Sequence, residues 1–223
     1  MPTFHPACYV RKGAWLAQFR RRATAQFWDE EWLARSEDKT RHALRSHASL
    51  ASHGKLFRQW LPKPGVILEA GCGTGLWVRR FLDRGYNCIG LDYAILTLQR
   101  SKRVVPDLPL LAGDVSSLPF DDGSLAAYVS FGVVEHFEAG PCLALREAVR
   151  VLRPGGVALI SAPYENPYRR NIATVDEQTA QRQGLEFYQY YFAPSVFFLR
   201  VKSRRLDTGA SSFALVRRAY WAA

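Results

Sequence analysis

The sequence predicts an α/β fold with a Rossmann-like, doubly wound and mostly parallel sheet, helices on both faces of that sheet, and an N-terminal helical segment. Between residues 66 and 162, short apolar segments alternate with helical segments, which is typical of a parallel sheet built from β-α-β units. These short segments carry apolar residues on both faces, as strands covered by helices on both sides do. The run from Leu61 to Gly65 holds two prolines and a glycine and marks the clearest boundary in the chain. We therefore divide the chain into a basic helical cap, residues 1–62, and a main domain, residues 63–223.

The N-terminal segment is predicted to form two helices. Apolar residues at the spacing i, i+3, i+4 predict a helix over residues 14–35, and a second helix is predicted over residues 38–60, up to the Pro/Gly run. The apolar face of the first helix consists of Leu16, Phe19, Ala23 and Phe27. Arg20, Arg21 and Arg22 lie beside that face, so the cap combines apolar and basic surfaces.

The main domain is predicted to alternate strands and helices before it becomes less regular. The predicted strands are Val66–Glu69, Cys88–Leu91, Leu108–Leu111, Leu125–Phe131 and Val157–Ala162. The predicted helices are Gly75–Arg84, Ala94–Arg103 and Pro141–Leu152. For the last third we expect a loop-rich segment over Tyr164–Gly184, a helix after Pro194 within the aromatic stretch Phe187–Arg200, and a terminal hairpin of Arg205–Asp207 and Ser212–Val216.

The composition fits a folded protein with basic flanks. The chain has 223 residues, of which 48% are hydrophobic and 22% are charged, as in a globular domain that buries a sizeable core. The net charge is +10, and its basic excess lies in residues 1–65 and 166–223, around a nearly neutral middle. Such flanks favour an anionic substrate, a nucleic acid or an anionic membrane surface, or they are simply solvated charge.

The cysteines and the apolar runs exclude several classes of protein. Cys8, Cys72, Cys88 and Cys142 form no C-x-x-C pair and accompany no histidine cluster, so we expect neither a metal site nor a disulfide framework. The N-terminal region has no uninterrupted apolar stretch typical of a signal peptide. No apolar run reaches the roughly 18 residues that span a bilayer. These observations favour a cytoplasmic protein with reduced thiols.

The most informative motif is a glycine-rich turn at the end of the first predicted strand. It reads Glu69-Ala70-Gly71-Cys72-Gly73-Thr74-Gly75. Glycines at such a turn let a ligand approach the backbone closely, and the helix that follows presents free N–H groups. The dinucleotide fingerprint G-x-G-x-x-G/A would need glycine or alanine at position 76, but that residue is Leu76. The turn therefore predicts a nucleotide-type ligand and disfavours a nicotinamide cofactor.

Two carboxylates follow the next two predicted strands. Asp92 ends the second strand, where it would accept hydrogen bonds from both hydroxyls of a ribose or else cap the helix that begins after it. Asp114 follows the third strand, where it would accept a bond from an adenine amino group or else be a simple turn residue. Because ligands of open α/β sheets bind beyond the carboxyl ends of the strands, the pair predicts a nucleoside site.

The ordered set of motifs resembles class I S-adenosylmethionine-dependent methyltransferases, in particular the small-molecule branch that includes ubiquinone-biosynthesis-type enzymes. The resemblance covers about residues 60–165. It rests on the glycine turn, Asp92, Asp114, the Val134-Glu135-His136-Phe137 segment, and Val151-Leu152-Arg153-Pro154-Gly155-Gly156.

The resemblance implies a donor site for S-adenosylmethionine, which leaves as S-adenosylhomocysteine. It implies that the backbone around Gly71, Gly73 and Gly75, with Glu69 and Cys72 in the same turn, would hold the methionine part. Asp92 would bind the ribose with Tyr93 beside the adenine, Asp114 and Val115 would read the adenine, and Ser130 and Phe131 would line the methyl-transfer channel.

Catalytic and substrate-binding candidates come from segments beside that site. His136 follows the fourth predicted strand, and its near-neutral reference pKa would suit removal of a proton from an oxygen acceptor; alternatively, Glu135-His136 orients the following loop. Trp28, Tyr164 and Tyr191 are candidates for the substrate pocket, with core packing as the alternative. Ser161-Ala162-Pro163-Tyr164 only weakly resembles the N-P-P-Y motif of nucleic-acid methyltransferases and follows the wrong strand for it.

These observations predict an enzyme that methylates a small molecule, with an oxygen acceptor favoured. RNA methylation is an alternative suggested by the basic flanks, but no recognisable RNA-binding module supports it. A cofactor-binding partner subunit without activity is another alternative, suggested by the short C-terminal segment. A peripheral membrane contact would use Arg20–Arg22 and the Leu16/Phe19 face. The sequence leaves the acceptor and the oligomeric state open.

Overall fold

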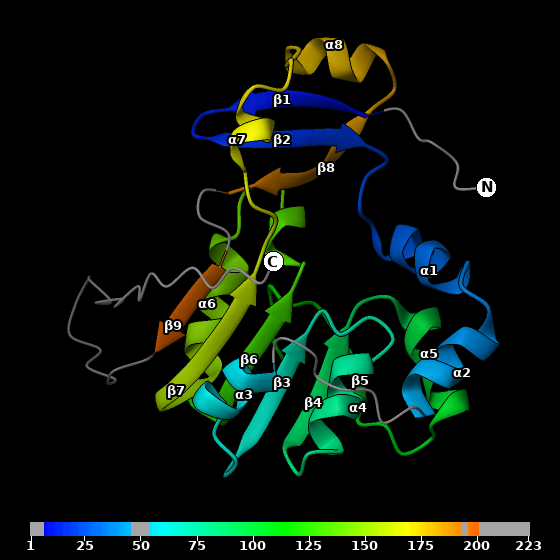
Figure 1. Cartoon of the computed structure of the whole chain (residues 1–223), viewed down its shortest axis with the longest axis vertical. Coiled ribbons are helices and arrows are strands. Elements are labelled where there is room, and N and C mark those ends of the chain that lie inside the picture. Colours follow the sequence, from blue (N-terminus) through cyan, green and yellow to red (C-terminus); the bar gives the residue numbers. More distant parts are fainter. Residues whose placement is uncertain (1–6, 46–53, 193–195, 201–223) are drawn as a thin grey trace.

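The computed structural model of the chain describes residues 7–45, 54–192 and 196–200, and within them the strands form two sheets (Figure 1). In spatial order, the larger sheet consists of β5 (Leu110–Ala112), β4 (Asn87–Asp92), β3 (Val66–Ala70), β6 (Leu125–Phe131), β7 (Leu152–Ser161) and β9 (Val196–Arg200). All neighbouring pairs are parallel except β7 and β9, which are antiparallel. The predicted doubly wound, mostly parallel sheet is confirmed.

The order of the strands creates a crevice at one edge of this sheet. The chain enters at the central strand β3, moves outward through β4 and β5, and then returns to the other side of β3 with β6 and β7. The crossover connections therefore leave β3 and β6 in opposite directions. Beyond the carboxyl ends of these two strands lies the crevice where open α/β sheets bind ligands.

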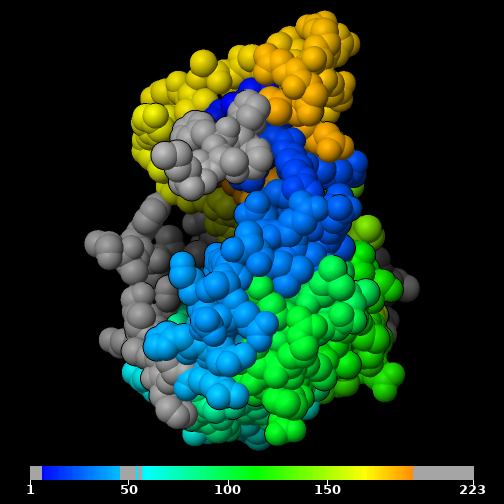
Figure 2. Space-filling model, turned by 90° about the vertical axis from the view of Figure 1, so that its right-hand side faces the viewer, coloured from blue at the N-terminus to red at the C-terminus, as the bar shows by residue number. Residues whose placement is uncertain are grey.

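Helices cover both faces of the larger sheet, as predicted. Alternate residues of each strand point to opposite faces, so Ile67 and Val129 belong to one buried apolar cluster and Leu68 and Tyr128 to the other. The first cluster lies under α2 (Glu37–Arg45), α3 (Gly54–Trp60), α4 (Leu76–Leu82) and α5 (Ile95–Val104), and the second under α6 (Cys142–Val151). Figure 2 shows α1 and α2 in blue lying against α5 in green.

A second sheet of three antiparallel strands stands above the crevice (Figure 1). Its strands are β1 (Cys8–Lys12), β2 (Trp15–Arg20) and β8 (Glu186–Tyr191). The predicted helix over 14–35 is therefore wrong in its first part, and only α1 (Ala25–Leu33) is helical. Gly13 turns the chain with a φ of +58°, and β2 gains backbone hydrogen bonds from neighbours on both sides, which outweigh the helix-like spacing of the apolar residues.

Other predicted elements also differ from the structure. The second N-terminal helix is α2, which ends at Arg45, and α3, which begins at Gly54, while residues 46–53 lie outside the described part. The predicted helix after Pro194 is wrong, since residues 196–200 are the strand β9 paired with β7. The loop-rich segment contains the short helices α7 (Pro167–Arg170) and α8 (Glu177–Arg182). The predicted terminal hairpin lies outside the described residues.

The small sheet takes β1 and β2 from the predicted cap and β8 from the predicted main domain. The two predicted segments are therefore joined through this sheet. The division of the chain into residues 1–62 and 63–223 stays a prediction.

Candidate functional site

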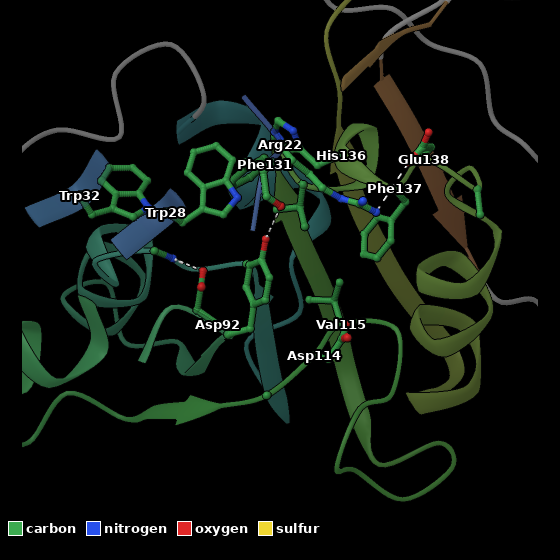
Figure 3. A pocket seen from close by; sticks show the side chains of 18 residues that line it. Arg22, Trp28, Trp32, Asp92, Asp114, Val115, Phe131, His136, Phe137 and Glu138 are labelled. Atoms are coloured by element: carbon green, nitrogen blue, oxygen red, sulfur yellow. Dashed lines mark hydrogen bonds and ion pairs between the residues drawn. The ribbon is translucent and has the colours of Figure 1, made fainter. Parts of the chain in front are cut away.

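A cavity of about 610 Å³ lies in the crevice at the carboxyl ends of β3, β4, β5 and β6 (Figure 3). Its volume falls in the range of roughly 300–1,000 Å³ that is typical of small-molecule sites. The helix α1 closes one side, and the short 3-10 helix η2 (Val134–His136) closes another. The lining residues are Arg22, Ala23, Trp28, Trp32, Gly71, Gly73, Asp92, Tyr93, Gly113, Asp114, Val115, Phe131, Gly132, Val133, His136, Phe137, Glu138 and Ala139.

The glycine-rich turn forms the floor of the cavity where β3 ends. Gly71 and Gly73 line the cavity and have φ angles of +78° and +51°, a region that side chains with a Cβ rarely adopt. A Cβ on Gly71 would lie 2.3 Å from Cγ2 of Val133, and a Cβ on Gly73 would lie 3.0 Å from the Trp32 ring. Both positions thus require glycine, and the bare backbone leaves room for a ligand beside it.

Four of the predicted donor-site residues do not line the cavity. They lie behind the glycine turn and stabilise its conformation. The Glu69 carboxylate accepts a hydrogen bond from the backbone N–H of Val78 at 2.8 Å and so satisfies the first turn of α4. Burial raises the pKa of Glu69 well above its usual value. Ser130 donates its hydroxyl to the Ala70 carbonyl at 2.9 Å and ties β6 to β3.

The other two are Cys72 and Gly75. The thiol of Cys72 is buried against β4, where a Cβ on Gly90 would lie 2.8 Å from its sulfur. Gly75, with a φ of +73°, is the N-cap of α4. Glu69, Cys72 and Gly75 belong to the turn, as predicted. Ser130 was expected to line the methyl-transfer channel, but its buried hydroxyl is used up between β6 and β3, and only its neighbour Phe131 reaches the cavity.

Asp92 is the buried carboxylate at the edge of the cavity. One carboxylate oxygen accepts from the Gly73 N–H at 2.7 Å and the other from the Ala94 N–H at 2.9 Å. The side chain therefore fastens the glycine turn to the end of β4. Burial raises its pKa, and the backbone N–H groups partly offset that effect. Each oxygen keeps a second lone pair, so Asp92 can also accept from two ligand hydroxyls.

Asp114, Val115 and Tyr93 line the same end of the cavity. The Asp114 carboxylate accepts from the backbone N–H and the hydroxyl of Ser116, both at 2.8 Å. That contact is the turn role considered above. The Tyr93 hydroxyl donates to the Ala23 carbonyl at 3.1 Å, which links the end of β4 to the loop before α1. The structure thus brings all three together with Asp92, as the sequence predicted.

His136 lies on η2 at the other end of the cavity, in a T-shaped contact with the Trp28 ring. Its Nδ1 is 2.8 Å from the carbonyl oxygen of Tyr188, so Nδ1 must carry the proton and Nε2 holds a free lone pair. Burial lowers the pKa of His136 to about 4. The argument that His136 has a near-neutral pKa is therefore wrong, because the ring is neutral throughout the physiological range.

Glu135, the neighbour of His136, is a buried carboxyl with one oxygen 3.9 Å from the His136 Nε2. Among the described residues, its other oxygen has no hydrogen-bond partner. Burial raises the pKa of Glu135 to about 7. A group whose pKa is raised in the folded state stabilises the fold below its unfolded pKa, and this contribution disappears as the pH rises through the folded value.

Replacing Glu135 with glutamine should therefore raise the free energy of unfolding relative to wild type at pH 8, by up to about 3 kcal/mol, and change it far less near pH 4.5. The lowered pKa of His136 makes acidification destabilising. Wild type and Glu135→Gln both contain His136, so this contribution cancels when their free energies of unfolding are compared. Urea denaturation at both pH values measures this. The matched control is Glu147→Gln, which removes a carboxylate whose pKa Arg150 lowers and should instead destabilise at pH 8. Equal shifts of Glu135→Gln at both pH values would contradict the assignment.

The predicted substrate-pocket residues do not all meet. Trp28 lines the cavity, with its ring 5.0 Å from His136 and stacked near Trp32 at 6.5 Å. The structure does not bring Tyr164 and Tyr191 to the cavity. The Tyr191 hydroxyl donates to Gln18 at 2.9 Å within the small sheet, and Tyr164 forms an isolated bridge with Phe192. For these two the alternative of structural packing holds.

Sequence reasoning missed several lining residues, chiefly from α1, the loop before it, and the loop around η2. They are Arg22, Ala23, Trp32, Gly113, Gly132, Val133, Phe137, Glu138 and Ala139. Two signals were available: Trp32 is one helical turn after Trp28, and Phe137 belongs to the motif segment that contains His136. The position of Arg22 had no signal, because it depends on the loop that separates β2 from α1.

Together, the fold and the site define a Rossmann-like domain whose cavity suits a nucleoside-containing cofactor. Among the described residues, no group of three or more His, Cys, Asp or Glu side chains is placed to hold a metal ion. A sequence model described as a methyltransferase domain matches residues 68–160. This domain belongs to the class I S-adenosylmethionine-dependent methyltransferases.

Similar proteins carry related names. A demethylmenaquinone methyltransferase of Renibacterium salmoninarum is 38% identical over 107 residues, which are 46% of this chain and 44% of that protein. The tRNA (carboxymethyluridine(34)-5-O)-methyltransferase alkbh8 of Xenopus tropicalis is 30% identical over 56% of this chain and 20% of its own length. The methyltransferase solved with the Haloferax volcanii Trm112 activator is 24% identical, with a TM-score of 0.49, over 70% of this chain and 74% of that one. The chain spans less than half the length of the curated relatives named here.

Proposed function

We propose that this chain transfers the methyl group of S-adenosylmethionine to a hydroxyl oxygen of an uncharged small molecule. The observation that carries the proposal is a single cavity that joins the strand-end carboxylates Asp92 and Asp114 to an aromatic compartment around the neutral His136. The methyltransferase domain supports the type of reaction, and the cavity supports the class of acceptor.

The residues at the strand ends fit the donor. Asp92 would accept from the ribose hydroxyls, and Asp114, Val115 and Tyr93 would surround the adenine. Gly71 and Gly73, which line the cavity without a side chain, would hold the methionine part close to the backbone. When bound, the cofactor supplies a methyl group already activated by the sulfonium, so the protein mainly has to align donor and acceptor.

The other end of the cavity favours an apolar acceptor with a ring. Trp28, Phe131, Val133 and Phe137 supply aromatic and aliphatic surface. Among the described residues that line the cavity, Arg22 carries a positive charge. Its guanidinium nitrogen lies 3.6 Å from a carboxylate oxygen of Glu138, which partly compensates that charge. An acceptor with a net negative charge would lose more hydration here than this pair returns.

His136 would orient the acceptor and receive its proton. With Nδ1–H held by the Tyr188 carbonyl, Nε2 can only accept a hydrogen bond, which fits a hydroxyl donor. As the new C–O bond forms, the hydroxyl proton becomes strongly acidic, so even a base with a pKa of about 4 can take it. In the transfer to the acceptor oxygen, Nε2 of His136 would receive the hydroxyl proton.

Incubation with S-adenosylmethionine labelled in its methyl group and cell extract, followed by the mass of labelled products, tests the proposal. We expect the label in the methyl ether of an apolar hydroxyl compound. We also expect at least a tenfold lower turnover for His136→Ala, since general-base assistance contributes roughly 10²–10⁴-fold. His42→Ala, which changes an exposed histidine of α2, is the control. Label found only in RNA would refute the small-molecule acceptor. Unchanged turnover of His136→Ala across pH would refute the role of His136 as a base.

RNA methylation is a second candidate, favoured by the relative named for tRNA and by the basic flanks. Against it, two of the N-terminal arginines are paired in the structure, Arg21 with Glu30 and Arg22 with Glu138. RNA binding that weakens steeply with salt would support this candidate. The alternative of a partner subunit without activity would be supported by cofactor binding without turnover.

The peripheral membrane contact needs a different surface from the one expected. Leu16 and Phe19 are 0% and 1% exposed within the small sheet, so the predicted Leu16/Phe19 face is not available. Of the helices in the described part of the chain, none has the length and apolarity to cross a membrane. A cytoplasmic location stays part of the proposal.

A further inference from the structure

We infer that Asp29 and Arg100 are positioning residues of the donor site, because they fasten α1, which carries Trp28 and Trp32, to α5. This inference rests on the proposed function, since it concerns the donor compartment of the same cavity. It assigns a role to two buried charged residues, 8% and 5% exposed, that do not line the cavity and that no motif of the sequence singled out.

The first attachment runs from α1 to the start of α5. The Asp29 carboxylate accepts from the Thr97 backbone N–H at 2.7 Å, from the Thr97 hydroxyl at 2.8 Å and from the Leu96 N–H at 3.3 Å. The N-cap of α5 is Ala94, whose side chain makes no cap bond. Asp29 therefore supplies from another helix the acceptor and the negative charge that the start of α5 requires.

The second attachment runs in the opposite direction, from α5 to the end of α1. The Arg100 guanidinium donates to the Trp32 carbonyl, to the Leu33 carbonyl at 3.2 Å and to the Arg35 carbonyl at 2.9 Å. It also donates to the Thr40 hydroxyl at 3.2 Å. These carbonyls belong to the last turn of α1 and the chain after it, where the regular helical hydrogen bonds run out. The Trp32 carbonyl also accepts from the Arg35 N–H at 3.3 Å, so Arg100 is its second donor. Each helix thus caps one end of the other.

The consequence for the site is a fixed wall. The Trp32 ring lies so close to Gly73 that a Cβ there would be 3.0 Å from it, and Trp28 contacts His136. Asp92 and Tyr93 directly precede α5 in the chain. The Tyr93 hydroxyl also donates a hydrogen bond to the Ala23 carbonyl, just before α1. The attachments therefore set the distance between the aromatic wall and the ribose-binding end of the cavity. Figure 2 shows α1 in blue beside α5 in green.

Titration with S-adenosylhomocysteine by calorimetry tests this inference on the full chain. We expect Arg100→Met to bind at least tenfold more weakly than wild type, and Arg100→Lys to recover part of the affinity, because lysine can still donate to the carbonyls. Asp29→Ala should behave like Arg100→Met, with Asp29→Asn intermediate. Amide hydrogen exchange of residues 25–33 should accelerate in the same order, which a general loss of stability would not confine to α1.

The matched control is Arg150→Met. Arg150 also binds backbone carbonyls, those of Phe120 and Leu118, but it lies away from the cavity and should leave affinity unchanged. Folded Arg100→Met and Asp29→Ala proteins with wild-type affinity would overturn the inference. Should Arg100→Met fail to fold, wild-type affinity in both Arg100→Lys and Asp29→Asn would overturn it. Wild-type protein that does not bind S-adenosylhomocysteine would instead refute the proposed function, while hydrogen exchange would still test the attachments.

Discussion

Replacing Asp92 with alanine should lower the affinity for S-adenosylhomocysteine about 100-fold. Hydrogen bonds to a charged group contribute about 1.5–3 kcal/mol each, so the loss of two ribose bonds costs at least about 3 kcal/mol. Since about 1.4 kcal/mol corresponds to a tenfold change in affinity, this is an effect of about 100-fold. The same substitution leaves the buried N–H groups of Gly73 and Ala94 without their acceptor, so the glycine turn also loses its attachment to β4. Calorimetric titration of the folded variant measures the affinity.

The control for this substitution is Asp176→Ala. Asp176 accepts from the backbone N–H of Thr179 at 2.9 Å and from its hydroxyl at 2.7 Å as the N-cap of α8, and it is remote from the cavity. Its loss should lower stability slightly, as the loss of one exposed helix cap does, and leave affinity unchanged. Folded Asp92→Ala protein that binds within threefold of wild type would show that Asp92 only holds the turn.

The parallel sheet could be predicted because each of its strands carries its own signal. Leu125–Phe131 carries apolar residues on both of its faces, as a strand buried on both faces requires, and the structure places its residues in both apolar clusters. The glycine turn and Asp92 could also be located, because their positions follow from where strands end. These are local properties that need no knowledge of the rest of the chain.

The small sheet was missed because half of the pairing of its central strand is not local. Residues 15–20 pair with β1 across the turn at Gly13, and on their other side with β8 from the far end of the chain, where Tyr191 pairs with Leu16. Without that partner, Leu16, Phe19, Ala23 and Phe27 match a helical face equally well. The error extended to the site, since the loop that carries Arg22 exists only because β2 ends at Arg20 and α1 begins at Ala25.

The properties of His136 could not be read from its residue type. The sequence located it beside the donor site, but its pKa depends on burial and on the Tyr188 carbonyl, which β8 brings to η2. The same applies to Asp29 and Arg100, whose roles arise only when α1 packs on α5. The acceptor compartment is thus defined by contacts between distant segments, whereas the donor compartment is largely defined by strand ends.

Substituting Gly71 with alanine should destabilise the protein by about 2–5 kcal/mol and also weaken donor binding. A left-handed φ costs a residue with a Cβ roughly 1–2 kcal/mol, and a forced collision in a packed interior costs about 1–3 kcal/mol more. The collision here is with Val133, 2.3 Å from the added carbon. Since Val133 lines the cavity, its displacement changes the space available to the ligand.

Gly85→Ala separates these two effects. Gly85 has a φ of +74°, close to the +78° of Gly71, but a Cβ there would meet nothing within 4 Å. It should therefore lose only the conformational part, about 1 kcal/mol, with donor affinity unchanged. The double variant Gly71→Ala/Val133→Ala should recover part of the stability that Gly71→Ala loses, because residues in contact are coupled by about 0.5–3 kcal/mol. Additive effects in urea denaturation would place the cost of Gly71→Ala in the backbone alone, whereas coupling would show that the cofactor turn and the wall of the acceptor compartment are packed as one unit.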